Sequence, residues 1–129
     1  MTTNRRIFTQ GLAVLGVTAA APAFAQAKTV EVAMKQSPKM LFVPAVANIK
    51  VGDTVHWTNA YSTSHTVTFD PAKAATPANV ALPEGVAPFD SGNVEEDGSF
   101  SHTFTVKGTY KYICIYHEAM GMVGTVVVS

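Results

Sequence analysis

Cysteine is almost absent from this chain of 129 residues, which has a single thiol, at Cys114. Charged residues are also few, at 14%, and the nine basic and nine acidic side chains cancel. We find no Gly-rich phosphate loop, internal repeat or heptad pattern in the sequence. These absences argue against a disulfide scaffold, a P-loop nucleotide-binding protein and a coiled coil. The lack of a basic patch argues against a nucleic-acid partner.

The first 25 residues have the composition of an export signal. "MTTNRRIFTQ" carries Arg5 and Arg6, and the short apolar run "GLAVLGVTAAAPAFA" ends with the small-x-small pattern that a signal peptidase accepts. The run is too short for a comfortable membrane span. We therefore predict a signal peptide over residues 1–25 and one domain over residues 26–129. The paired arginines resemble a twin-arginine signal, although ordinary secretory signals also contain such pairs.

Cleavage of this signal would remove both arginines and leave seven lysines against nine acidic residues, a net charge of about −2. A near-neutral charge argues against stable association of the mature domain with an anionic membrane surface. Export also places Cys114 in an oxidising compartment without a disulfide partner. A free thiol there is a liability unless something occupies it.

Extended segments dominate residues 26–129. Apolar and polar residues alternate in "TVEVAMK", "TVHWTN", "GSFSHTFTV" and "GTYKYIC", with the period of a half-buried strand, and "VGTVVVS" closes the chain. The alternation places Phe104 and Val106 on the same face of their segment. Turn-forming residues separate the segments, a spacing typical of a β-sandwich or barrel. The exception is residues 71–98, which hold four prolines and three glycines and could carry at most a short helix around residues 72–75.

The residues that carry chemistry are concentrated in "YKYICIYHEAMGMVGTVVVS". Cys114 ends an expected strand, His117 lies three residues on, and Met120 and Met122 lie just beyond. A thiolate and an imidazole at this spacing can meet if the chain turns sharply, and the Met122 thioether can return to the same point. Soft sulfur and borderline nitrogen ligands select copper or zinc. The blue-copper set needs a second histidine, which must come from elsewhere in the chain.

Of the three remaining histidines, His65 has the most suitable position. It lies where the polar loop "NAYSTS" becomes the alternating segment "HTVTFD", as a ligand at the rim of a sheet would. His56 alternates with apolar residues and is expected on a solvated face. His102 shares its face with two phenylalanines and is expected to be packed and not to be a ligand.

With these residues the chain resembles the plastocyanin-like branch of the type 1 blue copper proteins, the cupredoxins, which includes plastocyanin, pseudoazurin and amicyanin. "VEVAM" and "FVPAVANIKVGDTVHWTN" look like the plastocyanin opening, "SHTVTFD" like its first ligand segment, and "GTYKYICIYHEAMGMVGTVVV" like its C-terminal ligand loop. The resemblance implies an all-β, Greek-key sandwich with one type 1 copper. It also implies the copper ligands His65, Cys114, His117 and Met122.

The resemblance leaves two candidates for the axial ligand, Met120 and Met122. Amicyanin-like relatives place this methionine three residues after the histidine, where Met120 stands, whereas plastocyanins and pseudoazurins place it five residues after, where Met122 stands. By the same resemblance, the backbone amide of Thr66 is placed to reach the thiolate. Tyr116 stands where the family often has proline, so we expect a different loop stiffness.

The function implied by the resemblance is one-electron transfer in the periplasm by a monomeric, exported protein that is not an enzyme. Its partners would be redox proteins that dock near His117. Ile113 replaces the tyrosine of a remote electron route found in many plastocyanins, so the photosynthetic partner is not carried over. The acidic run at residues 95–97 is interpreted as a solvated turn.

Two alternatives use the same residues. A copper carrier or chaperone would bind the metal with this ligand set but would not cycle it between oxidation states. A thiol enzyme would use Cys114 as nucleophile and His117 as base, although no orienting third group accompanies them.

Overall fold

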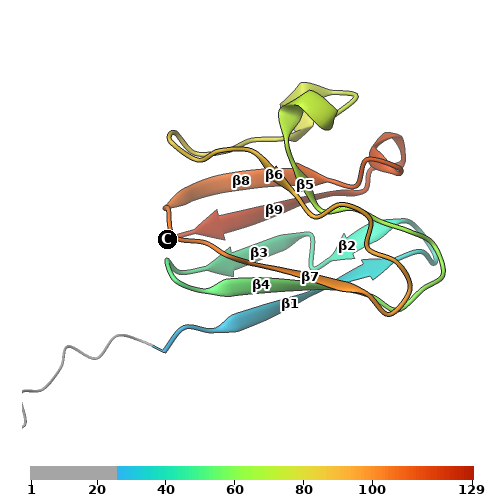
Figure 1. Cartoon of the computed structure of the whole chain (residues 1–129), viewed down its shortest axis with the longest axis horizontal. Coiled ribbons are helices and arrows are strands. Elements are labelled where there is room, and N and C mark those ends of the chain that lie inside the picture. The colour runs from blue at the N-terminus through green and yellow to red at the C-terminus, as the bar shows by residue number, and fades with distance from the viewer. Residues whose placement is uncertain (1–25) are drawn as a thin grey trace, which may run out of the picture.

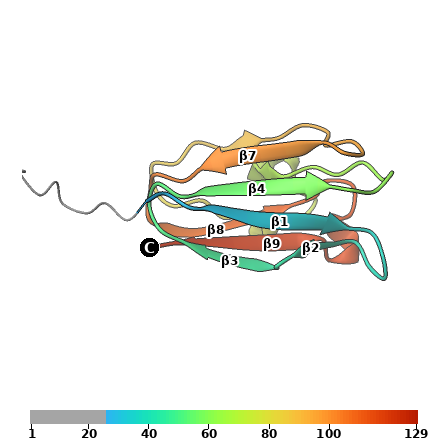
Figure 2. The ribbon, with the colours of Figure 1, turned by 90° about the horizontal axis from the view of Figure 1, so that it is seen from below.

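Two β-sheets pack face to face in the computed structural model, which describes residues 26–129 (Figures 1 and 2). The predicted signal peptide lies outside the described residues. One sheet has the order β2-β1-β4-β7 and the other the order β3-β9-β8-β5-β6. The pairs β1/β4 and β3/β9 are parallel and the other pairs are antiparallel. The predicted all-β sandwich is confirmed.

The first sheet consists of β1 (Thr29–Lys35), β2 (Leu41–Val43), β4 (Thr54–Asn59) and β7 (Ser99–Thr103). The second consists of β3 (Val46–Ile49), β5 (Thr68–Phe69), β6 (Phe89–Asp90), β8 (Gly108–Ile113) and β9 (Val123–Val128).

The core lies between the sheets and is built around Trp57. Alternate residues of β1, β4 and β8 point inward, as their period of two predicts. Trp57 is fully buried, and its indole Nε1 donates a hydrogen bond of 3.0 Å to the hydroxyl of Tyr112. Phe69 and Phe104 pack against the same indole. An aromatic core therefore fixes β4 against β8, the strand that leads to Cys114.

The segment after β5 forms an excursion that rises beyond the sheet (Figure 1). It contains two short 3₁₀ turns, η1 (Pro71–Lys73) and η2 (Pro77–Asn79). The proline that begins each turn suits the first position of a helix. Lys111 of β8 donates to the carbonyl of Ala78 and fixes the excursion beside β8. The sequence allowed at most a short helix around residues 72–75, and η1, a single 3₁₀ turn, lies at that place.

One expectation about side-chain direction is wrong. The alternation predicts Val106 on the same face as Phe104, which is buried, but β7 ends at Thr103 and Val106 is 41% exposed. β7 pairs with β4 only as far as Thr103, which lies opposite Thr54, so Val106 is beyond the ladder. Val106 therefore lies in the β7–β8 connection, on the surface.

The C-terminus and the loop between β8 and β9 lie at opposite ends of the sandwich (Figure 1). This loop contains η3 (Glu118–Met120). No helical segment of residues 26–129 is long and apolar enough to cross a membrane.

Candidate metal centre

Three predicted site residues meet at one end of the sandwich. His65, Cys114 and His117 are all buried, and one potential ligand atom from each lies within 4.8 Å of the others. The Sγ atom of Cys114 is 3.7 Å from Nδ1 of His65 and 3.5 Å from Nδ1 of His117. The thiol thus lies between two imidazole nitrogens.

Hydrogen bonds of the backbone bring these residues together from separate segments. His65, just before β5, exchanges two hydrogen bonds with Val94, of 3.1 and 2.7 Å. Cys114 follows β8, and its amide donates to the carbonyl of Met122 at 3.1 Å. The amides of His117 and Met122 donate to the carbonyls of Cys114 and His117, respectively. Gly121 has a φ of +85°. This left-handed conformation allows the turn that brings Met122 back beside Cys114.

The spacing of these donor atoms fits a transition metal. A planar site with bonds of ~2.1 Å has ligand–ligand edges of ~3.6 Å, close to the two sulfur–nitrogen distances. His65 Nε2 is buried without a hydrogen-bond partner among residues 26–129, whereas its Nδ1 is turned toward the sulfur. A thiolate with two imidazoles selects copper or zinc and not a hard cation.

Burial favours the neutral form of both imidazoles, which is the form that binds a metal. Burial lowers the pKa of His65, and the neighbouring His117 lowers it further. Burial also lowers the pKa of His117. Neither ring therefore has to lose a proton near pH 7 before it can bind a metal.

The two methionines of the loop differ in burial. Met122 is 0% exposed and belongs to the core cluster that includes Cys114, whereas Met120 is 64% exposed. Because an axial thioether must face the metal from inside the protein, this difference favours Met122.

A pair of alanine variants tests this choice. We expect Met122→Ala to retain copper but to shift its reduction potential and visible spectrum, and to lose about 2–5 kcal/mol of folding free energy because it leaves a cavity. Met120→Ala is the matched control. It should leave the reduction potential, the visible spectrum and the folding free energy unchanged, because the Met120 side chain lies in solvent. Voltammetry and spectra of both copper-loaded variants give the answer. The opposite pattern would move the axial role to Met120.

The thiolate has a backbone donor, as predicted. The amide of Thr66 donates to Cys114 Sγ at 3.4 Å. The Thr66 hydroxyl in turn accepts a hydrogen bond of 3.0 Å from the amide of Ile115. Thr66 therefore connects the two segments that carry His65 and Cys114. Donors to a ligating sulfur tune the potential of the metal.

A network of side-chain hydrogen bonds connects Thr66 to the surface. The Thr66 hydroxyl lies 2.9 Å from that of Thr68, which donates to Asp90 at 2.8 Å. Asp90 also accepts a hydrogen bond of 2.8 Å from Lys73 of η1. Although partial burial opposes the ionised form, the hydrogen bonds from Lys73 and Thr68 lower the pKa of Asp90 overall. An ionised Asp90 only accepts, which fixes the direction of the Thr68 hydrogen bond. This hydrogen-bond network could not be predicted from the sequence, because its residues follow no local spacing pattern.

The two other histidines lie outside the cluster. His56 is half-buried, and its Nδ1 lies 2.7 Å from the carboxylate of Glu31 on the neighbouring strand. His102 stacks on Phe89, with ring centroids 4.0 Å apart, as expected of a packed residue.

Comparison with known proteins identifies the family. A family model described as copper binding proteins, plastocyanin/azurin family, matches residues 28–129. The chain belongs to this family. The membership confirms the resemblance drawn from the sequence and the predicted copper cofactor.

Individual relatives within the family agree. Plastocyanin of Scenedesmus fuscus is 35% identical over 93 residues, which cover 72% of this chain and 91% of that protein. Chloroplastic plastocyanin of Tetradesmus obliquus is 37% identical over 93 residues, which cover 72% of this chain but only 61% of that protein. The solved structure of a copper(I) mutant of amicyanin is 30% identical, with a TM-score of 0.60 over 78% of this chain and 82% of that one.

Proposed function

We propose that this chain is a one-electron carrier that uses a single type 1 copper, held by His65, Cys114, His117 and Met122. The observation that carries the proposal is the buried convergence of two imidazole nitrogens on one thiol. Copper, when bound, supplies reversible one-electron redox chemistry. The residues supply a soft, dry and preformed ligand set.

Rigidity is the contribution of the fold to this function. Three of the four ligands lie in one loop anchored between β8 and β9, and Cys114 and Met122 are fully buried. Densely packed side chains move little, so these residues would hold a copper ion with little rearrangement when its charge changes. A small rearrangement favours fast electron exchange.

The same burial argues against both alternatives. A copper carrier must hand its metal to another protein, which is slow when the thiol and the thioether are 0% exposed. A thiol enzyme needs a nucleophile that a substrate can reach, and the Cys114 sulfur is not accessible. We therefore assign an electron carrier that is not an enzyme.

We propose further that the protein is exported to the periplasm by the twin-arginine route and acts there as a monomer. Arg5 and Arg6 support the route because they precede the apolar run of the signal.

Electrons are proposed to enter and leave beside His117, which is 9% exposed. Exposed apolar residues lie around it in the sequence, and we call them the apolar rim: Ile115, Tyr116, Ala119, Met120 and Val123. Transient redox complexes use small interfaces, so a rim of this size is sufficient. Docking here would bring a partner close to the site through a single imidazole.

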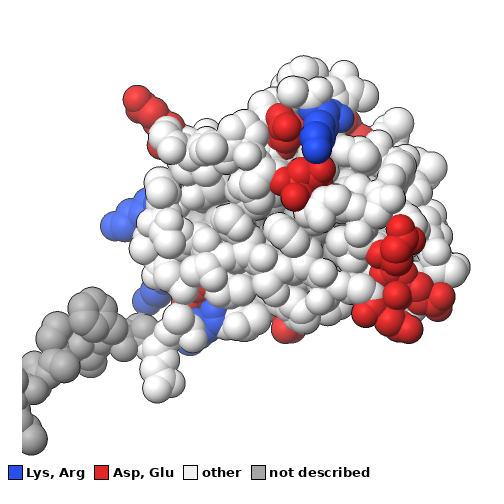
Figure 3. Space-filling model, viewed as in Figure 1, with Lys and Arg blue, Asp and Glu red and all other residues white. Residues whose placement is uncertain are grey.

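A second surface lies near the docking site. Acidic side chains gather beside the loop that precedes β7, at the same end of the sandwich as η3 (Figure 3). Glu95, Glu96 and Asp97 are exposed there, and Gly98 closes a turn on the carbonyl of Glu95. The structure thus agrees with the interpretation of this run as a solvated turn.

Electron self-exchange between two copies tests the docking surface. We expect Met120→Glu to slow self-exchange by about tenfold, because it places a charge in an interface that must exclude water. Val106→Glu is the matched control: it adds the same charge to an exposed valine in the connection that precedes β8, at the far end of the sandwich. NMR line broadening of mixed oxidation states gives the rate.

A third variant tests the acidic run. Neutralising Glu95, Glu96 and Asp97 together should cause only a modest, salt-dependent change in rate. If Met120→Glu behaves like Val106→Glu while the triple variant changes the rate strongly, the docking site lies at the acidic turn instead.

A further inference from the structure

Glu118, the residue after His117, has a buried carboxylate that the copper site itself does not use. The residue is only 8% exposed. Its Oε1 accepts a hydrogen bond of 2.8 Å from the amide of Ala75, and its Oε2 accepts one of 3.1 Å from the amide of Thr76. A carboxylate that accepts two amide hydrogen bonds from a distant segment is a specific tie between two parts of the chain.

The tie joins the ligand loop to the excursion between η1 and η2. The remaining hydrogen bonds of Glu118 and Met120 in the loop are local, such as the one from Gly121 to the carbonyl of Glu118. On the other side of His117, the Tyr116 hydroxyl donates to Asn93 at 2.5 Å. His117 is therefore flanked by two residues that are each tied to a different distant segment.

We propose that Glu118 is a positioning residue for His117, which fixes the imidazole in the site and lowers the reduction potential of the copper. This inference rests on the proposed ligand set. The tie holds the backbone of the loop, so His117 cannot swing away from Cys114. The carboxylate also adds a negative charge beside the site, which stabilises the more positive, oxidised metal.

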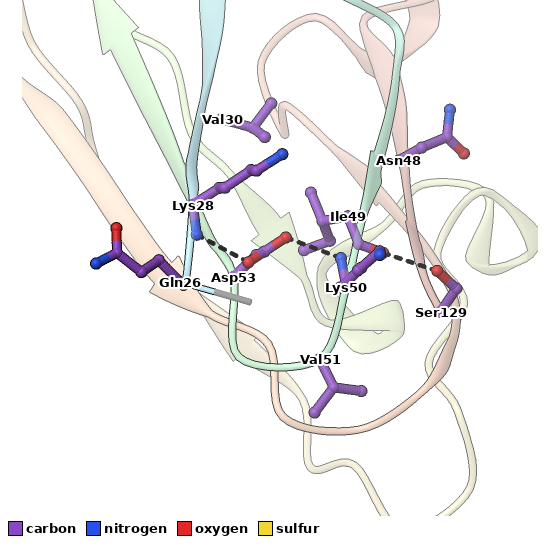
Figure 4. A pocket seen from close by; sticks show the side chains of 9 residues that line it. All are labelled: Gln26, Lys28, Val30, Asn48, Ile49, Lys50, Val51, Asp53 and Ser129. Carbon is purple, nitrogen blue, oxygen red and sulfur yellow. Dashed lines mark hydrogen bonds between the residues drawn. The ribbon is translucent and has the colours of Figure 1, made fainter. Parts of the chain in front are cut away.

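The chain contains a matched control for this residue. Asp53 is 7% exposed, and its two carboxylate oxygens accept hydrogen bonds of 2.9 Å each from the amides of Lys28 and Lys50 (Figure 4). Lys50 is three residues from Asp53 and Lys28 is 25 residues away, so Asp53 fixes its own turn to a distant segment, as Glu118 does. It lies beside Ser129 at the C-terminal end of the sandwich, far from the ligand loop (Figures 1 and 4).

The experiment compares Glu118→Gln with Asp53→Asn. Each replacement turns one acceptor oxygen into an amino group that faces a backbone N–H, so both variants should lower the melting temperature of the copper-free protein. Only Glu118→Gln should weaken copper binding, by about tenfold or more in competition with a chelator, and raise the reduction potential. Asp53→Asn should leave affinity and potential at the wild-type values.

The result that overturns the proposal is a Glu118→Gln variant whose affinity and potential equal those of Asp53→Asn. If Glu118→Gln does not fold, Glu118→Asp takes its place. That variant keeps the charge but is too short to reach both amides, so copper affinity should still fall, and wild-type affinity would refute a positioning role. Failure of the wild-type protein to bind and cycle copper is a separate outcome, which would refute the proposed function itself.

Discussion

A Cys114→Ser variant is expected to fold but to be colourless when loaded with copper. The thiolate is the soft ligand at the centre of the site, between the two imidazoles. A hydroxyl is a hard, neutral donor and cannot supply the sulfur-to-copper charge transfer that gives a blue site its colour. We expect copper affinity to fall by more than the ~10–100-fold typical of residues outside the ligand shell. Visible spectra and chelator competition measure both effects.

Correct folding of this variant has to be shown independently. Trp57 is fully buried beside Tyr112, so its fluorescence reports whether the core has formed without copper. A Cys114→Ser protein with wild-type fluorescence and no colour supports the assignment. A variant that stays intensely blue would exclude Cys114 as the ligand.

The second large effect is expected from Gly124→Ala in β9. Gly124 lies opposite Tyr112 of β8, and a Cβ atom at this position would be 2.3 Å from Tyr112 Cζ and 2.5 Å from its hydroxyl oxygen. The ring cannot withdraw, because Trp57 donates to its hydroxyl and Phe42 packs against it with centroids 4.6 Å apart. Overpacking of this kind costs about 1–3 kcal/mol.

For a domain of this size, such a loss should lower the melting temperature by about 10 °C. Thermal unfolding of copper-free protein measures it without a contribution from the metal. Thr125→Ala, at the next position of β9, is the control and should lower the melting temperature much less. If Gly124→Ala is as stable as the wild type, Tyr112 has free space and the packing of the aromatic core is not as described.

The strands that alternate cleanly were the predictable part of the fold. Val55 and Trp57 point inward, as do Tyr110 and Tyr112, because one face of each sheet meets the other sheet and the opposite face meets solvent. The alternation fails at β5, where Thr68 and Phe69 are both fully buried. The proline-rich excursion follows directly after β5, and its sequence has no period from which its position could be inferred.

The candidate site was predictable where its residues are close in sequence. Cys114, His117 and Met122 lie within nine residues, and the position of His65 at the start of a strand singled it out. Glu118 was missed because its partners lie 42 and 43 residues away. A single glutamate in a loop carries no signal of such a tie. Tyr116, where the family often has proline, was singled out by the sequence, but its hydrogen bond to Asn93 could not be predicted from it.

A reductive titration of the copper-loaded wild-type protein tests directly whether the chain is a one-electron carrier. We expect an intensely blue oxidised form that bleaches with one electron equivalent per chain and recovers its full colour on reoxidation. Absorbance recorded against added reductant, over several cycles, gives both the stoichiometry and the reversibility. A copper-loaded protein that is colourless, or one that loses its metal on reduction and does not regain its colour, would exclude a reversible blue copper site.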